Sequence, residues 1–246
     1  MKKKKYKKLN IKIFLLALCL VFIIIYCFFS SSEDFLSVGS YYSENKYPII
    51  NENTNKNYSG VGKDFVNNED GYSSTFTTNT NKVYKEFKQN GNSSWSNLDY
   101  WDGTMSDNGC GITAISIILS GYNIDYTPED LRQKYYPVLN GDSISSELSN
   151  TFNINNSDFL YDSEHLSANY IENYLLKDKP VLICVWDKPT DNRWTTASHY
   201  MVLLASDNNG KVYVSNPNGL ENTYKSSGWY PIEEVTPYIA KALFVY

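Results

Sequence analysis

The chain has few of the residues on which most catalytic and metal-binding sites depend. It contains two histidines and four cysteines, and two of the cysteines, Cys19 and Cys27, lie inside an N-terminal apolar run. Outside that run, the only possible disulfide joins Cys110 to Cys184, and a domain of this size can bury an adequate core without one. No pair of histidine, cysteine or acidic residues has the spacing of metal ligands, so we expect neither a metal nor another cofactor.

Basic residues are scarce outside the N-terminus. Seven of the 22 lysine and arginine residues lie within the first twelve positions, which leaves 15 basic residues against 27 acidic ones and a net charge of about −12. A protein that binds nucleic acid needs a basic face to contact phosphates, so this composition excludes that class of function.

The first 32 residues form a basic N-terminus followed by a hydrophobic signal or anchor segment. Ile13 to Phe29 is an uninterrupted apolar run of seventeen residues behind a lysine-rich flank, which is typical of an export signal. The run is at the short limit for a spanning helix. Ser30 and Ser32 offer a cleavage site without the usual alanines, so we favour an uncleaved anchor over a cleaved signal. In both cases the rest of the chain is expected outside the cytoplasm, at the cell membrane or secreted.

Composition divides the remainder into a tether and a domain. Residues 33–94 are rich in Asn, Ser, Thr and Tyr and contain no internal repeat, which predicts a largely disordered tether. Hydrophobic segments recur regularly over 95–246, which predicts one domain of about 150 residues. We expect this domain to be a monomer.

Cys110 occupies the first turn of a predicted helix. Residues 103–109 have the small, polar and glycine composition of a turn, and the apolar residues 112–119 predict a helix that ends near Gly121. Unpaired N–H groups and the positive end of the helix dipole favour a thiolate at this position. Glycines on both sides of the cysteine leave room for a substrate backbone. This is the setting of a cysteine nucleophile, and the alternative is a small buried apolar residue.

Helical patterns come before strand patterns along the domain, which predicts the α+β class. The expected helices lie at 110–120, at 128–136 and from Ser163 or Ser167 to Leu176, and a loop with short local structure is expected at 140–158. Strands are expected at 181–186, 199–205, 211–215 and 242–246. The segment 207–210, Asp-Asn-Asn-Gly, is a strong hairpin signal between the middle strands. Cys184 lies in a continuous apolar strand and is expected in the core.

Two histidines are candidates for the base that a cysteine nucleophile needs. His165 lies among polar and acidic residues and is expected at the surface. His199 opens an apolar strand, where a core histidine is the alternative. Asn216 follows the hairpin partner of that strand, so His199 and Asn216 fall at the same open end of the hairpin. The Asn216 amide can accept from one imidazole nitrogen and leave the other facing the thiol, and this role is compatible with an Asn-Pro turn.

Four motifs, in this order, resemble those of a known family: Gly109-Cys110-Gly111, Lys179-Pro180-Val181, Ser198-His199-Tyr200-Met201-Val202 and Val212-Tyr213-Val214-Ser215-Asn216-Pro217. They are similar to the papain-like cysteine peptidases of the bacteriocin-leader-processing (double-glycine) peptidase family, in particular its exported, stand-alone peptidase C39-like relatives. The resemblance covers 95–246. It implies a papain-like cysteine peptidase fold, in which the helix bearing the nucleophile packs on an antiparallel sheet. It also implies that Cys110 is the nucleophile, His199 the general base and Asn216 the orienter.

Two departures from that family concern the orienter and the oxyanion. The family usually has Asp where this chain has Asn216, although papain-like enzymes in general also use Asn. The leader-processing enzymes carry a Gln six residues before the cysteine, which donates to the oxyanion, and this chain has Thr104 there. Beside the Cys110 N–H, the candidates for the missing donor are Ser106 and Asn108. Loss of one such donor costs roughly 10²–10³ in rate.

These features predict an extracytoplasmic cysteine peptidase that hydrolyses peptide bonds of a peptide or protein substrate. Trp194, in the loop before His199, is a further candidate for substrate contact. Two alternatives stay open, namely a cell-wall peptide amidase on the same scaffold and a catalytically inactive surface binding module, which the missing Gln favours. Membrane contact is expected only through residues 13–29.

Overall fold

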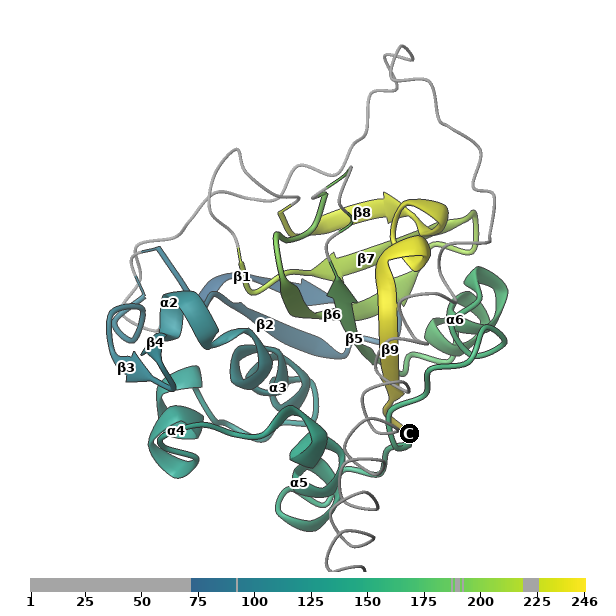
Figure 1. Cartoon of the computed structure of the whole chain (residues 1–246). Helices are drawn as coiled ribbons and strands as arrows, with labels where there is room; N and C mark the ends of the chain where they lie inside the picture. The colour runs from purple at the N-terminus through teal and green to yellow at the C-terminus, as the bar shows by residue number, and fades with distance from the viewer. Residues whose placement is uncertain (1–71, 92, 187, 189–190, 192, 219–225) are drawn as a thin grey trace, which may run out of the picture. The chain divides into compact units, whose positions relative to one another are not determined.

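The computed structural model describes residues 72–91, 93–186, 188, 191, 193–218 and 226–246 (Figure 1). Every described residue belongs to one compact unit, within 57–246. The predicted anchor at 13–29 and residues 33–71 of the predicted tether lie outside the described residues. None of the helices in the described part of the chain combines the length and the apolar composition that a membrane crossing requires.

A five-stranded antiparallel sheet with the order β8-β7-β6-β5-β9 forms the centre of the domain. Its strands are β5 (Val181–Trp186), β6 (Ser198–Ser206), β7 (Lys211–Ser215), β8 (Gly228–Pro231) and β9 (Ile239–Phe244). The predicted hairpin joins β6 to β7, and Asn208 and Gly210 have the positive φ values, 58° and 83°, that these residue types tolerate best. β8 was not predicted, because its four residues, Gly-Trp-Tyr-Pro, have no apolar period.

The two faces of the sheet are buried in two separate cores. Along β5, Leu182 belongs to the core that contains α3 (Cys110–Ser120), whereas Val181 and Ile183 belong to the core that contains α6 (Ala168–Leu175). A strand covered on both faces has no polar side, which explains its continuous apolar run. Figure 1 shows the two helices on either side of the sheet. The α+β prediction is confirmed, with α3 packed against the sheet.

Most of the remaining helices are short, and their caps follow the sequence. They are α2 (Met105–Asn108), α4 (Pro128–Lys134), α5 (Ile144–Asn150) and three 3₁₀ turns at Gly141–Ser143, Ile232–Glu234 and Thr236–Tyr238, and a small hairpin of β3 (Asp99–Tyr100) and β4 (Gly103–Thr104) precedes α2. Thr127 caps α4 as predicted, and Ser167, not Ser163, caps α6. The stretch predicted as a loop contains α5, whose serine-rich sequence is a weak helix signal.

A two-stranded ribbon precedes the sheet, within the segment predicted as a tether. β1 (Tyr72–Thr77) pairs with β2 (Val83–Phe87), and Tyr84 and Phe87 are fully buried in the core that contains α3. The prediction of a largely disordered tether is therefore wrong for residues 72–91. Composition alone did not reveal the ribbon, because the ribbon buries few large apolar side chains. Packing against α3 stabilises the ribbon, rather than the intrinsic strand propensity of its residues.

The ribbon is attached to α3 by close backbone contact. The Lys85 N–H donates to Oγ of Ser120 at 2.9 Å. A Cβ added at Gly121 would come within 2.0 Å of the Tyr84 ring, so the end of α3 and the ribbon can pack together only because residue 121 is glycine. The ribbon thus takes a defined position against the helix that carries Cys110.

Candidate active site

Cys110 is the first residue of α3, and a glycine allows a second helix to end directly before it. The Gly109 N–H donates to the Met105 carbonyl at 2.8 Å and closes α2, while the Gly109 carbonyl accepts the first bond of α3 from Thr113 at 3.0 Å. A Cβ at residue 109 would lie 2.5 Å from the Met105 oxygen. Glycine is therefore required at position 109 because the two helices meet there. The sequence had suggested only that this glycine leaves room for a substrate.

The side chain of Cys110 is half-buried, and its thiol has a raised pKa. Burial raises its pKa above the usual value, and the backbone N–H groups of Tyr200, Gly111 and Cys110 itself lower the pKa by less. The helix start does supply N–H donors, as predicted, but the expected thiolate is wrong for the resting protein because the loss of solvent outweighs them. Cys184 lies in the core as predicted, and burial raises its pKa to about 12.

His199 and Asn216 meet at the open end of the β6–β7 hairpin. The last paired residues there are Val202 and Ser215, and beyond them the two segments carry His199 and Asn216. Nε2 of the imidazole lies 2.7 Å from Oδ1 of Asn216, and both side chains are buried. The predicted contact is present. Because an amide oxygen only accepts, Nε2 carries the proton and Nδ1 is the nitrogen left to act as a base.

The imidazole is neutral at rest, like the thiol. Burial lowers the pKa of His199 to about 4, an effect that the bond to Asn216 opposes and the charge of Lys88 reinforces. With the pKa of Cys110 raised, both shifts favour the neutral forms, a thiol at Cys110 and an uncharged imidazole at His199. Within the described ranges, no group of three or more His, Cys, Asp or Glu residues is placed to hold a metal.

The amide of Asn216 is held in one orientation. Its Oδ1 accepts the Asn218 N–H at 2.9 Å in addition to the His199 ring, which identifies this atom as the oxygen. The bond to Asn218 is an Asx turn, so the predicted turn role and the contact with the histidine coexist. The Asn216 N–H donates to Oγ of Ser227 at 2.9 Å, and its carbonyl accepts from Nζ of Lys88 at 2.7 Å.

Asn108 and Thr104, both upstream of Cys110, have hydrogen-bond partners in the surrounding structure. The Asn108 amide donates to the Tyr100 carbonyl at 3.3 Å and to the Asp102 carboxylate at 3.1 Å, which directs it towards the β3–β4 hairpin. Thr104 and Asp107 form a capping box at the start of α2. The residue at the position of the family's Gln therefore serves as a helix cap.

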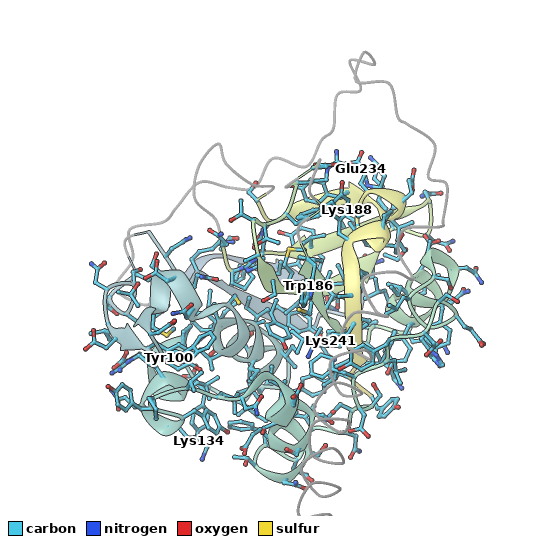
Figure 2. All side chains as sticks on the ribbon, in the orientation of Figure 1. Tyr100, Lys134, Trp186, Lys188, Glu234 and Lys241 are labelled. Atoms are coloured by element: carbon cyan, nitrogen blue, oxygen red, sulfur yellow. The ribbon has the colours of Figure 1, made fainter. Side chains whose placement is uncertain are left out.

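Trp194 and His165 lie outside this cluster. Trp194 is fully buried in the core on the α6 side, and its indole N–H donates to the carbonyl of Glu234, which is labelled in Figure 2, at 3.1 Å. The prediction that Trp194 contacts substrate is therefore wrong, because its large ring is used to fill the core. His165 is half-buried at the surface with Nδ1 2.7 Å from the Asp162 carboxylate, in agreement with the sequence.

Two residues that follow β2 reach the site and were not predicted. Nε2 of Gln89 donates to the Ser106 carbonyl at 2.7 Å, and its Oε1 is buried without a hydrogen-bond partner among the described residues. Lys88 bonds the Asn216 carbonyl, as described above. A polar composition gives no signal for such contacts; only Tyr84 and Phe87 just upstream hint that this segment is folded.

A family model described as "Peptidase_C39 like family" matches residues 94–236. A crystal structure of a protein from Bacillus anthracis, provisionally described as a C39-like peptidase, aligns with this chain at 13% sequence identity and a TM-score of 0.42, and the alignment covers 57% of this chain and 89% of that one. No curated protein matches the chain significantly.

Proposed function

The chain belongs to the peptidase C39-like family, and on this premise we propose that it is an extracytoplasmic cysteine peptidase that hydrolyses peptide bonds with Cys110, His199 and Asn216. The family indicates a peptidase of the cysteine type. The observation that carries the assignment of residues is the 2.7 Å contact between His199 Nε2 and Asn216 Oδ1. This contact leaves Nδ1 of His199 as the basic nitrogen. The residue that follows His199 in the sequence, Tyr200, donates its main-chain N–H to the Cys110 sulfur.

Acylation starts from the neutral pair. His199 Nδ1 takes the thiol proton as the sulfur attacks the carbonyl carbon, so proton transfer accompanies formation of the C–S bond. The Asn216 oxygen accepts from Nε2–H and stabilises the imidazolium that forms. The imidazolium then gives its proton to the amine nitrogen as the C–N bond breaks, which leaves a thioester and a neutral imidazole. The lowered pKa of His199 favours this second transfer, from the imidazolium to the leaving amine.

Deacylation reverses the roles of the same groups. His199 takes a proton from water, the resulting oxygen nucleophile attacks the thioester carbon, and the thiolate leaves and recovers the proton. The Cys110 N–H, free of an intrahelical partner at the helix start, donates to the oxyanion. Gln89 is an additional candidate for the second donor, beside Ser106, because its buried amide already bonds the main chain of that segment. The Asn108 amide is directed elsewhere.

Turnover of an unbiased peptide library by the full chain tests the proposal. Cys110→Ala should lower kcat by a factor on the order of 10⁶, as loss of a nucleophile does, while Cys184→Ala keeps turnover. His199→Ala should abolish turnover, and His165→Ala should be close to neutral. If the His165 variant is the inactive one, the assignment of the base is wrong.

A thiol-directed probe separates the two alternatives. A binding module would leave Cys110 inert towards the probe, whereas both hydrolases would be labelled. An amidase would then cleave cell-wall peptides and leave the linear peptide library intact. The proposed location is tested by adding protease to intact cells, which should digest the domain if residues 13–29 anchor it with the domain outside.

A further inference from the structure

Residues 88–90, which we refer to as the strap, hold residues 216–218. The contacts are Lys88 Nζ to the Asn216 carbonyl at 2.7 Å, the Gln89 N–H to the Pro217 carbonyl at 3.0 Å, and the Asn90 amide to the Asn218 side-chain oxygen. Three consecutive residues thus bond three consecutive residues. The strap directly follows the β1–β2 ribbon, ahead of the region that the family model matches. It connects the ribbon to the segment that carries the proposed orienter.

Lys88 is a buried cation within the strap. Only 6% of the residue is exposed, and its Nζ donates to Oγ of Ser227 at 2.8 Å as well as to the Asn216 carbonyl. The same Ser227 oxygen accepts the Asn216 N–H at 2.9 Å. Lys88 and Ser227 therefore hold both main-chain polar groups of Asn216. Burial lowers the pKa of Lys88 and the nearby Glu86 raises it, so a carboxylate offsets part of the cost of burying the ammonium.

The charge of Lys88 also acts on His199. It lowers the pKa of the imidazole, in the same direction as the larger effect of burial and against the effect of the hydrogen bond that the ring makes. Other titratable groups among the described residues share these contacts. They are Glu86, which acts on Lys88, the Cys184 thiol on β5, which accepts the main-chain N–H of His199, and the Cys110 thiol on α3, which accepts the main-chain N–H of Tyr200. Of these groups, Lys88 is the one whose charge acts on the imidazole of His199.

We propose that Lys88 is a positioning residue of the site. From inside the protein it fixes the main chain of Asn216, so that the amide holds the His199 imidazole, and its charge opposes a second cation on that ring. The ring then stays neutral and able to accept the thiol proton. The effect on turnover rests on the proposed peptidase function, whereas the effect on the imidazole does not. The strap makes the β1–β2 ribbon part of the catalytic unit.

Lys88→Met in the full chain tests this role, because methionine keeps the apolar stem and removes the donors and the charge. We expect kcat to fall about 10- to 100-fold, the scale of one lost hydrogen bond from a charged group, with KM little changed. NMR of the two imidazoles in chain labelled with ¹³C-histidine should show a higher pKa for His199. The acid limb of the kcat/KM profile should move to higher pH with it. Lys88→Arg, which keeps the charge and the donors, should retain the wild-type imidazole pKa and recover part of the rate.

Two further variants keep the test decisive. Lys85→Met removes a surface lysine of the same ribbon and should leave kcat and both imidazoles unchanged. Ser227→Ala keeps the charge and removes the shared acceptor, so kcat should fall without a rise in the His199 pKa. Wild-type kcat and wild-type imidazole titration in Lys88→Met would overturn the proposal; if that variant does not fold, a wild-type rate in Ser227→Ala overturns it. A chain that cleaves no peptide, but in which Lys88→Met raises the His199 pKa, would refute the peptidase function and support the positioning role.

Discussion

Acidification from about pH 7.5 to about pH 4.5 should weaken the folded domain through His199. Burial, as the largest cause, lowers the pKa of this residue from 6.5 to about 4 in the folded protein. Between these two values the unfolded chain binds a proton that the folded chain does not, so the free energy of unfolding falls as the pH falls through this window. This loss of stability is absent at pH values above the pKa of the unfolded chain, and it is complete at pH values below the pKa of the folded protein.

The shift from 6.5 to about 4 corresponds to a loss of about 3.5 kcal/mol when the whole window is crossed, at about 1.4 kcal/mol per pKa unit. Since the measurement stops near pH 4.5, about 2.5 kcal/mol of that loss should be observed. Carboxylates with hydrogen-bond partners, such as Glu147 and Glu129, have a lowered pKa in the folded protein. They stop stabilising the fold as the pH falls below the ordinary pKa of a glutamate, which lies mostly outside this range. Histidine therefore dominates the slope above about pH 4.5.

Urea denaturation of the full chain at several pH values measures this slope. His199→Gln should be less stable than wild type at neutral pH, but it should lose the histidine part of the slope because glutamine does not titrate. His165→Gln, at the half-buried histidine beside Asp162, is the matched control. If His199→Gln keeps that slope and His165→Gln loses it, the imidazole of His199 is not a buried neutral group, and the neutral pair on which the proposed acylation step depends is wrong.

Iodoacetamide should alkylate Cys110 faster than Cys184 at every pH, and the rate at Cys110 should still rise above about pH 9 because burial raises its pKa; equal rates, or a plateau near about pH 6, would contradict the protonated thiol. Asn216→Asp should keep substantial turnover and move the acid limb of the pH profile to higher pH, because a carboxylate stabilises the imidazolium. Asn216→Ala should lose much more turnover, and a wild-type rate in that variant would reduce the residue to its turn. Phe87→Ala should lower the free energy of unfolding, measured by urea denaturation, by about 3–5 kcal/mol. Val83→Ala, at a 47% exposed position of the same strand, should change it by no more than about 0.5 kcal/mol. Equal effects of the two substitutions would contradict the burial of β2 in the core.

Local patterns in the sequence were sufficient for the elements that carry the three proposed catalytic residues. The turn-like residues before Cys110 and the apolar run after it predicted α3 with the correct start. The Asp-Asn-Asn-Gly turn set the register of the β6–β7 hairpin, and that register places His199 and Asn216 at one end. Such predictions succeed because turn chemistry and periodicity act over a few residues, and neither depends on the rest of the chain.

The properties that tertiary contacts decide could not be read in this way. The aromatic ring of Trp194 fits a substrate site or a core equally well in sequence, and only packing places it in the core. The helix start argued for a thiolate at Cys110, but the surrounding atoms exclude enough water to reverse that effect. The sequence therefore determined where the reactive groups lie along the chain, and the fold determined their protonation.

The strap shows the same division most clearly. Lys88 lies in a segment whose composition is that of a tether, and its partner Asn216 is 128 residues away. No local pattern encodes a bond over that separation, because the bond depends on how the ribbon packs against α3 and on where the β6–β7 hairpin ends. Lysine is usually a surface residue, but here it is buried, and its charge acts on the neighbouring imidazole. The sequence alone determined the order and type of the elements, and only the tertiary structure decided which distant side chains share one buried environment.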